Sequence, residues 1–159
     1  MLLYFMQHGT QLSSLKDPKE GLAPEGVETV RKSAKALKKM GISFDQILTS
    51  TKKRAVETAQ IVADTFSYDG EIVQSEKLKP MTIAVETIDF LKEYENKESI
   101  FITGHLPSIL NTCAFLLGYE NLKIEIIRGS CLCLELPTLD KCAAMLKWYM
   151  PPDVLEMMN

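Results

Sequence analysis

The sequence lacks the features on which several classes of protein depend. Its 18 basic residues do not outnumber its 21 acidic residues, and the net charge is −3. A nucleic-acid or anionic-membrane surface needs a basic face, so this balance argues against both kinds of partner. No apolar run approaches the roughly 20 residues that a membrane-spanning helix needs. We therefore expect a cytoplasmic protein without a nucleic-acid or membrane partner, and the sequence leaves its oligomeric state open.

Cysteine is also scarce, and its spacing suits neither a metal site nor a disulfide framework. The four cysteines are Cys113, Cys131, Cys133 and Cys142, and they include no Cys-x-x-Cys pair. A domain of this size needs no disulfide bonds to be stable. Cys131 and Cys133 have no histidine nearby, which makes them poor metal ligands. We expect reduced, buried thiols, and neither a metal ion nor another cofactor.

Short apolar runs alternate with amphipathic helices along the chain, a pattern typical of α/β proteins. Residues 2–6 form a continuous apolar run, which indicates a first strand buried on both faces rather than a signal peptide. Further strands are predicted at 45–49, 71–74 and 99–103, and helices at 24–40, 52–66, 82–94 and 107–117. The length of 159 residues is that of one domain, which we expect to span residues 1–159.

The last third of the chain has a different character. Three strand-like segments follow one another across short turns, at 123–127, 130–136 and 142–149. This spacing predicts a meander at one edge of the sheet. The apolar tail at 151–158 leaves two alternatives open: either it caps the core or it meets another subunit.

The sequence has only two histidines and three arginines, and three of these side chains converge on one place. His8 and His105 each follow a predicted buried strand directly, and each has a neighbouring glycine, Gly9 or Gly104. Arg54 falls in the first turn of the helix that follows another strand. Ligands of α/β sheets bind at the carboxyl ends of the strands, so we expect all three side chains at the same rim. A forked cation beside a helix N-terminus suits a phosphate group, although each residue taken alone would more often be structural.

Four segments of the chain contain these residues in a characteristic order. They are residues 3–10 (LYFMQHGT), 22–26 (LAPEG), 49–59 (TSTKKRAVETA) and 102–108 (ITGHLPS). They resemble, in turn, the strand with its Arg-His-Gly motif, the Leu-Thr-Pro-x-Gly helix start, the Ser-x-x-x-Arg-Ala-x-x-Thr-Ala segment and the second Gly-His motif of the histidine phosphatase superfamily. The resemblance covers most of the chain. The short length and the lack of a large inserted cap are similar to those of the SixA-like phosphohistidine phosphatases.

The resemblance implies a phosphoglycerate-mutase-like fold, a three-layer α/β/α sandwich whose central sheet is mostly parallel with an antiparallel edge. It implies that His8 is the catalytic nucleophile and becomes a phosphohistidine, which water then hydrolyses. Arg54 would clamp the phosphoryl oxygens, and His105 would hydrogen-bond them. The implied phosphate-binding residues are Gln7, His8, Gly9, Arg54 and His105, with no metal. Ser50 is a further candidate for a phosphate contact, or else a helix N-cap.

Gln7 departs from the family pattern, because it stands where the family has arginine. An amide still donates a hydrogen bond but brings no positive charge. Losing one donor to the transition state costs roughly 10²- to 10³-fold in rate, so we expect reduced activity. Lys16 and Lys52 are candidates for a substitute charge, although a mobile ammonium replaces a fork poorly.

A general acid is also missing from the pattern. Residues 78–91 offer Glu86 and Asp89, although both fit solvent-facing helix charges better. Without an acid, ester hydrolysis is disfavoured because an alkoxide leaves poorly, whereas the nitrogen of a phosphoramidate can be protonated beforehand. The first prediction is therefore a hydrolase, a metal-independent phosphatase for phosphohistidine on a protein. The alternatives are a catalytically weak or inactive module that binds phosphate or a phosphoprotein, and a phosphatase for a small phosphate ester.

Overall fold

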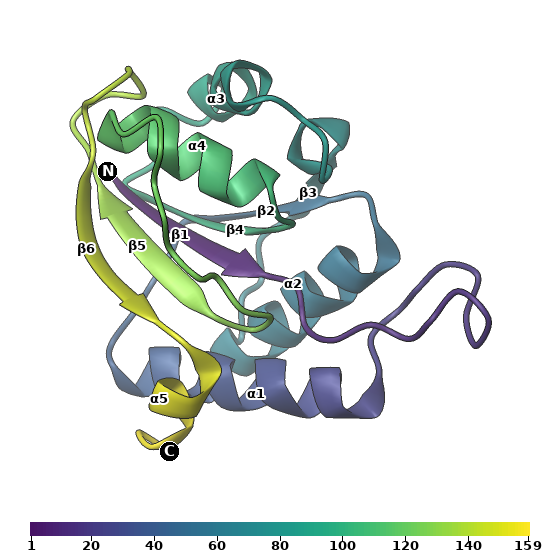
Figure 1. Cartoon of the computed structure of the whole chain (residues 1–159). Coiled ribbons are helices and arrows are strands. Elements are labelled where there is room, and N and C mark those ends of the chain that lie inside the picture. The colour runs from purple at the N-terminus through teal and green to yellow at the C-terminus, as the bar shows by residue number, and fades with distance from the viewer.

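A six-stranded sheet runs through the centre of the protein (Figure 1). The computed structural model describes residues 1–159, and the strands lie in the order β3-β2-β4-β1-β5-β6. Their bounds are Leu2–Gln7 (β1), Gln46–Ser50 (β2), Ile72–Ser75 (β3), Ser99–Gly104 (β4), Cys131–Glu135 (β5) and Met145–Met150 (β6). The first four strands pair in parallel, whereas β5 and β6 are antiparallel to their neighbours. The expected mostly parallel sheet with an antiparallel edge is confirmed.

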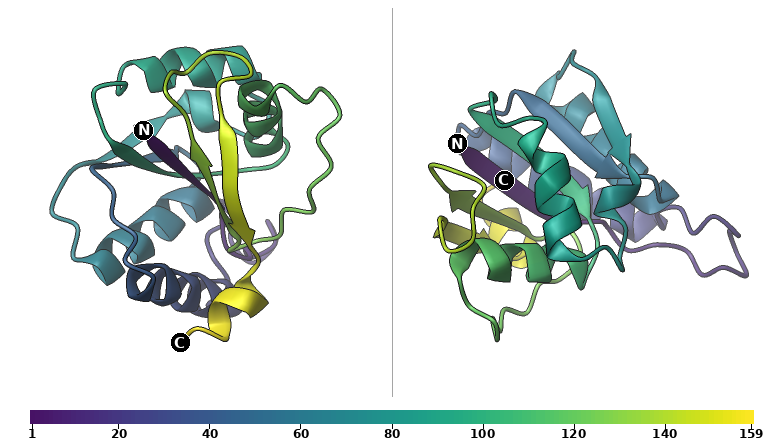
Figure 2. Two further views of the ribbon diagram at one scale, coloured as in Figure 1. Left: turned by 90° about the vertical axis from the view of Figure 1, so that its left-hand side faces the viewer. Right: turned by 90° about the horizontal axis from the view of Figure 1, so that it is seen from above.

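Helices cover both faces of the sheet and complete the predicted three-layer α/β/α sandwich (Figure 2). On one face lie α1 (Pro24–Lys39), α2 (Lys53–Phe66) and α5 (Pro152–Glu156), and on the other lie α3 (Ala84–Lys92) and α4 (Ser108–Leu117). A short 3₁₀ helix at Glu76–Leu78 is a feature that the sequence pattern does not predict. None of these helices combines the length and the apolar character needed to cross a membrane.

β1 separates two apolar cores. Leu3 and Phe5 pack in the core beneath α3 and α4, while Tyr4 and Met6 pack in the core beneath α1 and α2. Successive side chains of a strand point to opposite faces, so one uninterrupted apolar run serves both cores. The sequence prediction of a first strand buried on both faces is confirmed.

α1 shows why a helix begins and ends where the sequence predicts. Pro24 occupies the first turn, where its missing N–H is not needed, and Glu25 faces the positive end of the helix dipole. Val30 and Leu37 lie on the apolar stripe and are fully buried against the sheet. Gly41 follows the helix with a φ of 80°, in the left-handed region that favours glycine.

The meander predicted for the last third is only partly right. β5 and β6 form, but residues 123–127 form no strand and run as an irregular segment between α4 and β5. Tyr149 on β6 supplies the hydrogen bonds there: its Oη accepts from the Ile127 N–H at 3.3 Å and donates to the Glu125 carbonyl at 2.7 Å. A distant side chain thus satisfies backbone groups that a neighbouring strand would otherwise have bonded.

The C-terminal region departs from one expectation and resolves another. Cys142 is exposed, against the expectation of a buried thiol, and it takes a left-handed φ of 62° in the turn before β6. The other three cysteines are buried. The tail caps the core, because Leu155 of α5 is fully buried and Glu156 forms an ion pair with Lys32 on α1.

Candidate active site

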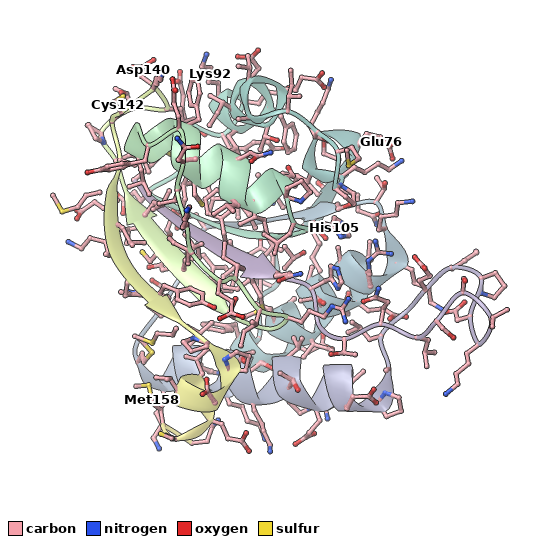
Figure 3. All side chains as sticks on the ribbon, in the orientation of Figure 1. Glu76, Lys92, His105, Asp140, Cys142 and Met158 are labelled. Carbon is pink, nitrogen blue, oxygen red and sulfur yellow. The ribbon has the colours of Figure 1, made fainter.

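The carboxyl ends of two central strands bring the two histidines together. β1 and β4 pair in parallel so that Gln7 lies opposite Gly104, and His8 and His105 follow side by side. Their ring centroids lie 4.9 Å apart with an interplanar angle of 57°. In Figure 3, His105 lies at the end of β4. The structure therefore places both rings at one rim of the sheet.

The hydrogen bonds of His8 define which ring nitrogen holds a lone pair. Nδ1 lies 2.7 Å from the Gly9 carbonyl oxygen, which can only accept, so Nδ1 carries the proton. Nε2 accepts a hydrogen bond from Nε of Arg54 at 3.2 Å. The Nε2 lone pair is thus held in place and directed at the guanidinium, an arrangement that suits a nucleophilic imidazole.

His8 is neutral at physiological pH. Its side chain is buried, and burial is the largest cause that lowers its pKa from 6.5 to about 4. The hydrogen bond to Gly9 acts in the opposite direction, while the positive charges of Arg54 and Arg128 lower the pKa further. A neutral ring keeps the Nε2 lone pair available across the range in which an ordinary histidine becomes protonated.

The ring of His105 lies beside that of His8 and forms a hydrogen bond with a serine. Its Nε2 lies 2.9 Å from Oγ of Ser50, and its Nδ1 is buried without a hydrogen-bond partner. Burial lowers the pKa of His105 to about 3, and the neighbouring His8, Arg54 and Lys52 lower it further. Lys52, and not Ser50, is the N-cap residue of α2, so the N-cap alternative for Ser50 is wrong.

Arg54 reaches the rim from the first turn of α2. Its side chain is largely buried, with 11% exposed, and its Nη1 donates to Oε2 of Glu20 at 2.9 Å. Its Nε donates to His8, whereas its Nη2 makes no hydrogen bond within the protein. Glu20 lies in the loop between β1 and α1 with a left-handed φ of 50°. One edge of the fork is therefore held by a carboxylate, and another faces the histidine.

The loop that carries His8 is locked against α1 and α2 by close backbone contact. A Cβ added to Gly9 would lie 2.8 Å from both the Gly26 carbonyl oxygen and Cγ2 of Val30, so no larger side chain fits without movement. The Gly9 N–H donates to Oγ1 of Thr58 at 3.2 Å, and Oγ1 of Thr58 donates to the Arg54 carbonyl at 2.7 Å. Thr58 thus ties the turn of α2 that bears Arg54 to the loop that bears His8.

Comparison with known families agrees with this geometry. The pattern of the histidine phosphatase superfamily (branch 1) matches residues 3–95, which is more than half of the chain and includes three of the four motif segments. The chain belongs to the histidine phosphatase superfamily. Its phosphoglycerate-mutase-like fold, expected from the sequence, is therefore confirmed together with the family.

Individual relatives of the superfamily show how far the likeness extends. The chain is 34% identical over 85 residues to the 2,3-bisphosphoglycerate-dependent phosphoglycerate mutase of Parvibaculum lavamentivorans, and the match spans 48% of the chain but only 40% of the mutase. The structure of the protein histidine phosphatase SixA complexed with tungstate superimposes with a TM-score of 0.85 and 22% identity, covering 96% of this chain and 98% of that one. SixA of Agrobacterium tumefaciens gives a TM-score of 0.79 at 18% identity, with 95% and 97% covered. At these identities the structural matches establish the fold.

Gln7, the departure from the superfamily pattern, lies at the end of β1 and is nearly buried. Its Oε1 is enclosed and makes no hydrogen bond. Of the two lysines considered as substitute cations, Lys16 lies exposed in the loop after β1 and its side chain makes no hydrogen bond. Lys52 is the N-cap residue of α2, two positions before Arg54, and its charge contributes to the lowered pKa of His105.

The structure places the two carboxylates considered as general acids on the surface of α3. Glu86 pairs with Lys77 at 2.7 Å, and Asp89 pairs with Lys92 at 3.1 Å. Both carboxylates are about half exposed or more, which agrees with their interpretation as solvent-facing charges. Neither contacts a histidine.

Sequence reasoning missed two charged residues at the rim, Glu20 and Arg128. Neither belongs to a motif. Glu20 lies in the loop between β1 and α1, and Arg128 lies in the irregular segment before β5, far from His8 along the chain. A scarce arginine next to a glycine was the only available signal for Arg128. Its position depends on the pairing of β5 with β1, which local sequence does not specify.

A surface hollow of about 610 Å³ lies beside Arg54, and neither histidine lines it. It is lined by the first turn of α2 and by the loop before α1, including Lys52 and Glu20. A larger hollow of about 820 Å³ lies at the opposite, amino-terminal edge of the sheet, around Met1 and Glu95. The candidate site is the rim where His8, His105 and Arg54 meet, and the smaller hollow borders it through Arg54.

Proposed function

We propose that the protein is a metal-independent phosphatase that forms a phosphohistidine on His8 and acts on phosphohistidine of a protein. One observation carries the proposal: the neutral ring of His8, with its proton held on Nδ1 by Gly9, directs the Nε2 lone pair towards the guanidinium of Arg54. A nucleophile beside a forked cation is the arrangement that phosphoryl transfer requires.

The first step is an in-line attack of Nε2 on phosphorus. The N–P bond to His8 forms while the bond from phosphorus to the leaving imidazole breaks, and that imidazole, protonated before the attack, departs with the electron pair of the broken bond. Nδ1 keeps its own proton throughout, and its N–H donates a hydrogen bond to the Gly9 carbonyl oxygen. Arg54, held in place by Glu20, then donates from its Nε and its free Nη2 to the phosphoryl oxygens, and Nδ1 of His105 is the remaining unpartnered donor or acceptor nearby.

The second step returns the enzyme to its starting state. Water attacks phosphorus from the side opposite Nε2, the N–P bond breaks, and inorganic phosphate leaves with the water oxygen. The electron pair of that bond returns to Nε2, so the ring is again neutral. The lowered pKa of His8 favours this form because a protonated Nε2 could not begin another cycle.

The choice of substrate rests on the carboxylates. Glu86 and Asp89 are paired with lysines on the outer surface, and Glu20 is bonded to Arg54, so none of these three carboxyl groups is free to protonate a leaving alkoxide. A phosphohistidine needs no such group, because its leaving nitrogen can be protonated before the bond breaks. The fold shared with the protein histidine phosphatase SixA supports the same choice.

A release assay with a carrier protein phosphorylated on histidine tests the proposal. We expect the wild-type protein to release phosphate and to carry an acid-labile, alkali-stable phosphoryl label after rapid quenching. His8→Ala should abolish both signals. Equal release rates for the wild type and His8→Ala would refute the enzyme. Tight binding of phosphate without turnover would instead favour the binding module, and hydrolysis of a small phosphate ester alone would favour the ester phosphatase with Glu86 or Asp89 as its acid.

A further inference from the structure

The turn before β5 lies against the residues that lead β1 to His8. The Gly129 N–H donates to the Gln7 carbonyl at 3.0 Å, and Cys131 pairs with Met6 in the antiparallel ladder between β5 and β1. Figure 1 shows this loop turning beside the end of β1 before β5 begins. Arg128 is therefore held within one residue of the backbone that positions the nucleophile.

The backbone at this turn is specific. Gly129 has a φ of 79°, which favours glycine, and a Cβ there would lie 2.9 Å from Cγ2 of Thr29 on α1. The turn is thus packed between β1 and α1, so the position of residue 128 is set by the fold. Arg128 itself is exposed to solvent.

Arg128 is the one arginine whose charge is not neutralised by a carboxylate. Arg31 pairs with Glu28 at 3.2 Å and Arg54 pairs with Glu20 at 2.9 Å, whereas Arg128 makes neither an ion pair nor a side-chain hydrogen bond. Its charge reaches His8 nonetheless, because it is one of the causes of the lowered pKa of that ring. An uncompensated guanidinium beside a neutral nucleophile is available for an anion.

The strand order places Arg128 and Arg54 on opposite sides of the two strands that carry the histidines. β4 and β1, which carry the two histidines, lie between β2 and β5 in the sheet. Arg54 follows β2 and Arg128 precedes β5, so the segments that carry these two arginines flank the histidines on the two sides. In phosphoryl transfer, negative charge spreads over three equatorial oxygens, which one fork cannot cover alone.

We propose that Arg128 binds the phosphoryl group at His8 and supplies the positive charge that the neutral Gln7 does not bring. This inference rests on the proposed function, since it concerns the same phosphoryl site. It makes Arg128 a binding residue that lies outside the four motif segments. It also assigns the replacement charge to a fork, in place of the ammonium groups of Lys16 and Lys52.

Binding of orthovanadate to the full-length protein tests the inference. We expect Arg128→Ala to weaken vanadate binding by about 10- to 100-fold, the effect of losing a charge-assisted contact. Arg128→Lys should lose less than Arg128→Ala. Arg31→Ala is the matched control, because it removes an exposed arginine that is already paired with Glu28, and it should leave affinity unchanged.

A second readout separates binding from a general structural effect. The pKa of His8, followed by NMR without ligand, should rise in Arg128→Ala and stay the same in Arg31→Ala, because of these two arginines only Arg128 acts on that ring. Wild-type vanadate affinity in Arg128→Ala, or an equal loss in Arg31→Ala, would overturn the inference. The proposed phosphatase would survive either result as long as His8→Ala abolishes phosphate release, so the two failures are distinguishable.

Discussion

The two buried histidines should make the fold sensitive to mild acid. In the unfolded chain each imidazole has an ordinary pKa near 6.5, whereas in the fold the pKa is about 4 for His8 and about 3 for His105. As the pH falls below 6.5, both imidazoles therefore bind protons in the unfolded chain, whereas in the folded chain they stay neutral until the pH is lower. Folding is most stable above pH 6.5, and that stability is lost progressively down to about pH 3 to 4.

The size of the effect follows from those values. Between pH 7.5 and pH 5 each imidazole should lower the free energy of unfolding by about 2 kcal/mol, or about 4 kcal/mol for both. That is a large part of the roughly 5–15 kcal/mol that stabilises an ordinary domain. Carboxylates with lowered pKa values, such as Asp17 and Glu135, lose their contribution only at lower pH, so they do not mask the change.

Urea unfolding at pH 7.5 and pH 5 measures this difference. Fluorescence of Trp148 is a suitable signal, because its ring lies 6.0 Å from that of Tyr4 at the edge of the core. His105→Gln should remove about half of the pH dependence, and His8→Gln combined with His105→Gln should remove most of it. If the double variant loses as much stability between the two pH values as the wild type, the assignment of the acid sensitivity to these rings is wrong.

Two further substitutions test the geometry of the rim. Gln7→Arg should strengthen vanadate binding by about tenfold if the side chain at position 7 faces the anion, and isothermal titration that finds no change would place that side chain elsewhere. Gly9→Ala should lower the free energy of unfolding by about 1–3 kcal/mol, because the new methyl group would press on the Gly26 carbonyl. Gly104→Ala is its control in the same denaturation experiment, since a Cβ there meets nothing closer than 3.5 Å; equal losses in both would argue against the close contact.

The parallel part of the fold could be predicted because its signals are local. A continuous apolar run such as residues 2–6 suits only a strand with a core on both sides, and the helix at 24–40 has its own start and stop residues. The convergence of His8, His105 and Arg54 followed from the rule that parallel strands end at the same edge. Their positions are thus consequences of topology, while their chemical roles stay predictions.

The irregular parts could not be predicted because distant residues decide them. Residues 123–127 have the composition of a strand, yet Tyr149 bonds their backbone instead. Arg128 lies 120 positions after His8 and is brought beside it by the register between β5 and β1. Glu20 reaches Arg54 from a loop that has no periodicity at all. No local pattern encodes such long-range pairings.

Two different nitrogens of the Arg54 guanidinium bind Glu20 and His8. Nη1 is occupied by the carboxylate at 2.9 Å, which stops the fork from rotating, and Nε consequently keeps its direction towards His8. A lysine at position 54 has a single ammonium group and cannot serve two separate faces in this way. An anion that binds Nη1 must displace Glu20. The measured affinity of such an anion is therefore set by its own binding free energy to Nη1 less that of Glu20. Glu20 therefore both fixes the orientation of the Arg54 side chain and competes with anions for Nη1.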